Sequence, residues 1–161
     1  MASSQHLGIY LSETVLELGI VADSTQCLEV VSSEIVPQKP VKGQILDAIS
    51  RLKNDFEAVG LILPREYIFP QVAESLEAEL KVPVTQGFFG VASAMYESRF
   101  GAAKHEKNFI ALTIGQDVDA GLWVDGRIST GADGLAGDFS NMLVNAFGKL
   151  YPVGNYMSYR G

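Results

Sequence analysis

The 161-residue sequence has a single cysteine, Cys27, and only two histidines, His6 and His105. One cysteine excludes an internal disulfide framework and any cysteine-rich zinc site, and it is typical of a protein from a reducing cytoplasm. Both histidines lie in polar segments, with no second histidine at ligand spacing. We therefore expect no bound metal.

Basic residues are also few: 12 lysines and arginines stand against 19 aspartates and glutamates, for a net charge of −7 at pH 7. A protein that binds nucleic-acid phosphates needs a basic face, so this balance argues against a nucleic-acid partner. No apolar run approaches the ~18 residues that cross a membrane, and the first residues do not resemble a secretion signal. These absences predict a cytoplasmic protein with no membrane partner.

What the sequence does have is enough apolar residue (47%) to build a core. Residues 7–11, 15–22 and 27–36 are runs typical of strands, and the short polar break at 12–14 predicts an antiparallel hairpin between the first two. Apolar residues at helical spacing predict helices at 43–56, around 72–80 and at 89–100, with strands at 58–63 and 82–85 between them. This alternation predicts a parallel α/β layer with an antiparallel edge.

After residue 107 the pattern changes to strands at 109–114, 120–124 and 127–129, with Asp125-Gly126 as a tight turn between the last two. A helix is expected at 138–148, with Asp138 at its N-cap or in its first turn. We therefore divide the chain into a first domain at 1–106 and the start of a second at 107–161.

Three stretches resemble the ROK family of repressors and sugar kinases, within the actin-like ATPase superfamily. LGIYLSET at 7–14 stands where the family has its first strand and a phosphate-binding turn. Pro83-Val84 and the Ala92-Ser93-Ala94 helix match a second family segment. The third, TIGQDVDAGLWVDGRISTGADGLAGDFSNM at 113–142, matches the family pattern without a gap, and its glycines at 115, 121, 126, 131, 134 and 137 all fall on family glycines. The resemblance implies a ribonuclease H-like α/β fold, a mixed β-sheet flanked by helices, with an incomplete second domain.

The positions that carry catalysis in the family are replaced here. The strand-1 aspartate and the Gly-Gly turn are Tyr10, Ser12 and Glu13. Glycine is needed where backbone must approach phosphate closely, and a glutamate there would repel a phosphate ~4 Å away by about 4 kcal/mol at an effective dielectric of ~20. The catalytic-base aspartate of the family kinases falls on Phe89, which cannot accept a proton. The resemblance thus implies a protein without kinase activity and without a bound cofactor.

Six further positions leave alternatives open. Asp117 and Asp119 stand where the second phosphate loop has glycines; they could bind a cation from one face, although a solvated turn is the preferred interpretation. Asp138 and Asn141 stand where the family has a sugar-binding glutamate and a histidine, so they are the candidate ligands for a sugar-like molecule, with a helix-capping role preferred for Asp138. Phe88 and Phe89 either fill the altered cleft or form an interaction patch.

We expect a catalytically inactive ROK-like domain that acts by protein interaction, as a homo-oligomer. An incomplete second domain would leave apolar surface uncovered, with Trp123 in its hairpin and a tyrosine-rich tail (Tyr151, Tyr156, Tyr159) available for contacts. One alternative is a non-catalytic sensor of a sugar or similar small ligand. Another is that the chain is an excised part of a larger kinase-like protein.

Overall fold

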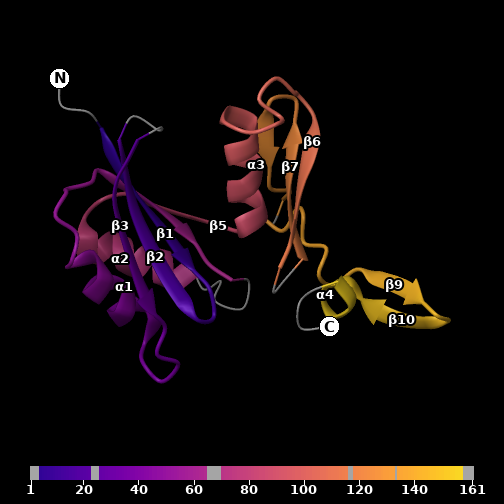
Figure 1. The fold of residues 1–161 in the computed structure, drawn as a ribbon, viewed down its shortest axis with the longest axis horizontal. Coiled ribbons are helices and arrows are strands. Elements are labelled where there is room, and N and C mark those ends of the chain that lie inside the picture. Colours follow the sequence, from indigo (N-terminus) through magenta and orange to yellow (C-terminus); the bar gives the residue numbers. More distant parts are fainter. Residues whose placement is uncertain (1–3, 23–25, 65–69, 116–117, 133, 158–161) are drawn as a thin grey trace. The chain divides into compact units, whose positions relative to one another are not determined.

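The computed structural model describes residues 4–22, 26–64, 70–115, 118–132 and 134–157 (Figure 1). The chain forms two compact units, Met1–Gly87 and Phe88–Gly161. The boundary after Gly87 differs from the division at residue 106 that we expected from composition. The physical reason is that helix α3 (Phe89–Arg99) packs on strands β6 and β7 of the second unit.

The first unit is a five-stranded mixed sheet in the order β3-β2-β1-β4-β5. Strands β1 (Gln5–Leu11), β2 (Val15–Ala22) and β3 (Gln26–Glu34) form an antiparallel meander, which confirms the predicted hairpin. Strand β4 (Ala58–Ile62) pairs parallel with β1, and β5 (Val84–Gly87) pairs parallel with β4. Helices α1 (Val41–Ile49) and α2 (Pro70–Leu80) connect these strands and lie next to each other.

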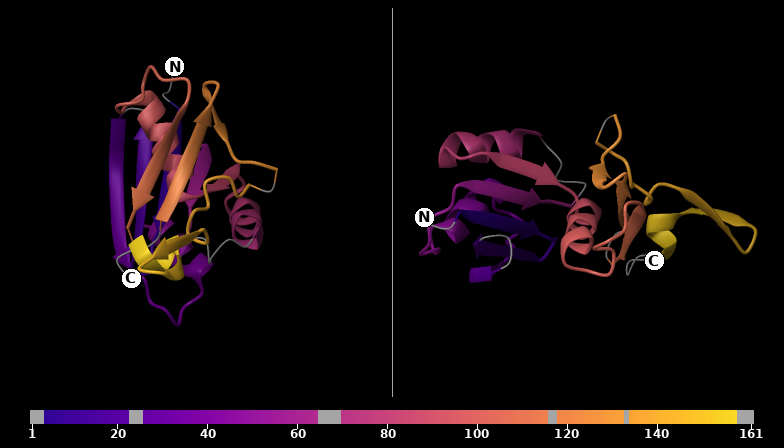
Figure 2. Two further views of the ribbon diagram at one scale, coloured as in Figure 1. Left: turned by 90° about the vertical axis from the view of Figure 1, so that its right-hand side faces the viewer. Right: turned by 90° about the horizontal axis from the view of Figure 1, so that it is seen from above.

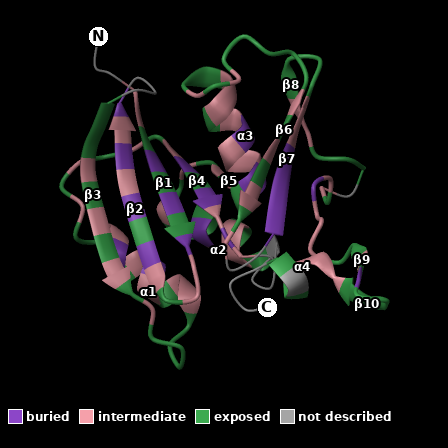
Figure 3. Cartoon of the chain, turned by 45° about the vertical axis from the view of Figure 1, so that its right-hand side comes forward, coloured by how far each residue is buried: buried purple, intermediate pink, exposed green. Residues whose placement is uncertain are grey.

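The core of this unit lies between the helices and one face of the sheet. Alternate side chains of β1 and β2 are buried, as the strand period of two requires (Figure 3). Ile45 and Ala48 from α1 and Leu76 from α2 complete the core. The opposite face of β1 carries His6, Gly8 and Tyr10, which are exposed.

Helix α1 is shorter than predicted, because it ends at Ile49 rather than at Phe56. The following segment returns to the sheet, where the Lys53 N–H and the Asn54 side chain both donate to the Glu29 carboxylate of β3. These hydrogen bonds lower the pKa of Glu29. Leu52 and Phe56 still pack against the core, so the apolar spacing correctly marked the core but not the helix end.

The second unit contains α3 and a three-stranded antiparallel sheet in the order β6-β7-β8. Strands β6 (Phe109–Ile114) and β8 (Arg127–Ser129) have the predicted bounds, while β7 (Val118–Val124) begins two residues earlier than expected. The β7–β8 turn has the expected chemistry, because Asp125 and Gly126 both have positive φ, 50° and 77°. The first four residues of β7 are all buried, since α3 covers one face and the segment after Gly137 lies against the strand edge.

The predicted helix at 138–148 is wrong. Residues Leu143–Ala146 form strand β9, which pairs antiparallel with β10 (Lys149–Pro152), and a short helix α4 (Val153–Met157) follows. Phe147 and Gly148 both have positive φ, 54° and 78°, and the Gly148 N–H donates to the Asn145 side chain. A short apolar run of this length fits a helix or a strand equally, and the turn at 147–148 decides for the hairpin. The hairpin extends away from the β6–β8 sheet (Figure 2).

Across the ranges that the structure describes, no helix is both long and apolar enough to span a membrane.

Candidate functional site

The turn between β1 and β2 is closed by its own side chain. The Ser12 Oγ accepts hydrogen bonds from the N–H groups of Thr14 and Val15, at 3.3 and 2.9 Å, while the Ser12 N–H donates to the Val15 carbonyl at 2.8 Å. Phosphate-binding turns work by pointing several backbone N–H groups at the anion. Here the N–H groups of Thr14 and Val15 already donate within the turn, so the turn has fewer N–H groups with which to bind a phosphate.

Tyr10 and Glu13 flank this turn in the first unit. Tyr10 is the penultimate residue of β1 and projects from the face opposite the helices, where 36% of it is exposed. Glu13 is half-buried within the turn itself. The structure thus brings Tyr10, Ser12 and Glu13 together at one end of the sheet.

Asp119 is not in a solvated turn; that interpretation was wrong. It lies in β7 and is only 7% exposed. Its Oδ2 accepts from the Gly90 N–H and its Oδ1 from the Ala120 N–H, both at 2.9 Å. Gly90 is in the first turn of α3, which has no capping side chain of its own, so the Asp119 carboxylate takes the place of an N-cap from a neighbouring strand.

Three glycines hold this junction together by close backbone contact. A Cβ on Gly121 would lie 2.1 Å from the Gly90 carbonyl oxygen, and a Cβ on Gly90 would lie 2.4 Å from the Ala120 carbonyl carbon. Gly137 has a φ of 93°, and its Cβ would meet the Ala120 carbonyl oxygen at 1.9 Å. The glycines at 121 and 137 that match the family thus serve packing in this chain. The role of Gly90 was not predicted, although a glycine in the first turn of a predicted helix could have indicated a close backbone contact.

The segment from Gly137 to Asn141 is fixed to β7 and α4. Ala120 N–H donates to the Gly137 carbonyl, Ser140 Oγ donates to the Val118 carbonyl at 2.7 Å, and Gly154 N–H donates to the Ser140 carbonyl. Asp138 is half-buried and Asn141 is exposed. Because no helix starts here, Asp138 is not an N-cap, and its N–H instead donates to the Leu135 carbonyl in a turn.

The remaining candidate residues differ in how far they are exposed. Phe89 is 47% exposed at the start of α3. Trp123 is half-buried and stacks on Phe109, with ring centroids 5.9 Å apart, so it is not the uncovered apolar surface we expected. Asp117 lies outside the described residues, as does Tyr159, and the side chain of Tyr156 is not described.

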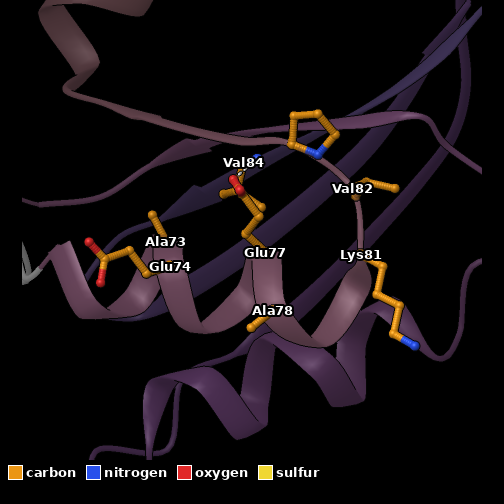
Figure 4. A pocket seen from close by; sticks show the side chains of 8 residues that line it. Ala73, Glu74, Glu77, Ala78, Lys81, Val82 and Val84 are labelled. Atoms are coloured by element: carbon orange, nitrogen blue, oxygen red, sulfur yellow. Dashed lines mark hydrogen bonds between the residues drawn. The ribbon is translucent and has the colours of Figure 1, made fainter.

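The described segments contain no group of three or more His, Cys, Asp or Glu side chains that could hold a metal ion. A shallow hollow of about 600 Å³ lies beside α2 and is lined by Glu74, Glu77, Lys81 and the start of β5; of these three side chains, Glu77 points toward Val84 (Figure 4). The Glu77 carboxylate accepts from the Val84 N–H at 2.9 Å, so this carboxylate already has a structural role in joining α2 to β5.

The two units define an α/β protein of the actin-like ATPase fold, in which an antiparallel meander begins each sheet. The sequence model of the ROK family matches residues 70–155, and the chain belongs to this family. The resemblance seen in the sequence is thereby confirmed.

Glucokinases of Streptomyces coelicolor and Streptomyces lividans are each 25% identical to this chain over 170 residues, which cover 92% of it and 53% of their own length. The chain thus spans about half the length of the curated relatives it matches.

Solved ROK structures have the same fold at lower identity. A hexokinase from Thermus thermophilus (23% identity, TM-score 0.76) covers 88% of this chain and is itself covered to 53%. A Streptomyces griseus glucokinase in complex with glucose and AMPPNP (20%, 0.77) covers 88% and is covered to 51%. A ROK transcriptional regulator homologous to the Escherichia coli MLC protein (20%, 0.79) covers 96% and is covered to 45%.

Proposed function

We propose that this chain is a non-catalytic ROK-family domain that acts by protein interaction, chiefly by associating with itself. The observation that carries the first half is the β1–β2 turn, in which the Ser12 hydroxyl occupies N–H groups that a nucleotide phosphate would need. The family's solved members include both kinases and a transcriptional regulator, so this fold also occurs in proteins named for roles other than phosphoryl transfer.

Two further replacements support the loss of kinase chemistry. Asp119, at a phosphate-loop position of the family, has both carboxylate oxygens engaged by backbone N–H groups within the protein. Phe89 stands at the catalytic-base position and has no group that accepts a proton. Phosphoryl transfer depends on positioning and charge stabilisation, and these residues supply neither.

We expect no binding of Mg-ATP with a dissociation constant below about 1 mM, which corresponds to roughly −4 kcal/mol. Isothermal calorimetry on the full chain measures this directly. We also expect no sugar phosphorylation by the native chain. The Phe89→Asp variant is expected to be inactive too, because it would regain a base but still lack a turn that binds phosphate. Turnover above background with glucose, N-acetylglucosamine or N-acetylmannosamine in a coupled assay would show that the proposal is wrong.

The interaction half of the proposal rests on apolar side chains that the second unit leaves in solvent. Ile110, Leu112 and Ile114 form one row on β6 and are 60%, 51% and 47% exposed. On the β9–β10 hairpin, Leu143, Phe147 and Leu150 are also exposed, Phe147 almost completely. Contiguous apolar surface of this kind marks interaction sites in soluble proteins.

We expect the native chain to be a dimer or larger at micromolar concentration, because association removes such surface from water. Sedimentation velocity over a dilution series measures the mass directly. Because no sugar or nucleotide is needed, the result is independent of the calorimetry above. A well-folded monomer throughout the series would contradict the interaction half of the proposal and leave the loss of catalysis standing.

A second candidate is a sensor that binds a sugar-like molecule without phosphorylating it. The observation that favours it is the rigid attachment of the segment from Gly137 to Asn141, which holds Asp138 and Asn141 beside β7 without further ordering. A thermal-shift screen of sugars tests it, since a ligand that binds only the native state raises the melting temperature.

A further inference from the structure

We draw no further inference here: the strongest candidate, the face of the first unit's sheet opposite α1 and α2, where Gly8 of β1 lies between Gly19 of β2 and Gly60 of β4, is an unpartnered row of small residues, and nothing in the part of the chain that the structure describes shows what covers it.

Discussion

Replacing Gly121 by alanine is expected to lower the free energy of unfolding of the second unit by about 3 kcal/mol, at the upper end of what overpacking costs. The added Cβ would lie 2.1 Å from the Gly90 carbonyl oxygen and 2.5 Å from the Ala94 Cβ. Both neighbours belong to α3, so the helix must move off the sheet to admit the methyl group. The only tryptophan, Trp123, lies in β7, and its fluorescence during urea denaturation reports this unit.

Gly115→Ala is the matched control, because a Cβ there meets no atom within 4 Å. It is expected to change the free energy of unfolding by less than about 0.5 kcal/mol, as surface substitutions usually do. If Gly121→Ala were as mild as Gly115→Ala, the close approach of α3 to β7 would be wrong, and the match of Gly121 to a family glycine would need another explanation.

Removing the Asp119 carboxylate is expected to cost nearly as much. Asp119→Ala leaves the Gly90 N–H without its acceptor inside a packed junction, while the Ala120 N–H keeps the Gly137 carbonyl. Orphaning a buried donor costs about 1–3 kcal/mol, so a loss of about 2 kcal/mol is expected. Asp119→Asn keeps an acceptor oxygen and should lose less. The measurement is again urea denaturation followed by Trp123 fluorescence.

Glu106→Ala is the control for this change, since Glu106 is an exposed acid of the same unit. An Asp119→Ala variant as stable as the Glu106→Ala control would contradict the capping role of Asp119.

Local sequence signals identified most of the first unit. The hairpin of β1 and β2 followed from two apolar runs with a short polar break, and strand β2 has the predicted bounds. Strands β6 and β8 were also found, because alternation and an Asp-Gly turn are signals carried by neighbouring residues. The ROK resemblance was visible for a similar reason, since its glycines keep their spacing along the chain.

Structural features that depend on residues far apart in the sequence were predicted wrongly. Helix α1 stops at Ile49 although apolar spacing continues to Phe56, because Glu29 of β3 binds the backbone and side chain of the segment that follows. The 143–152 segment is a hairpin because Phe147 adopts a positive φ. This conformation is rare for phenylalanine, so the residue type does not predict it.

The sequence by itself determined the family and the bounds of strands such as β6 and β8, because residue identity and spacing carry this information. Only the tertiary structure decided what individual polar side chains do. Ser12 closes its own turn, and Asp119, which alone looked like a solvated acid, caps helix α3 by accepting from Gly90, twenty-nine residues earlier in the sequence. A hydrogen bond needs donor and acceptor within about 3 Å, and that proximity is a property of the folded backbone.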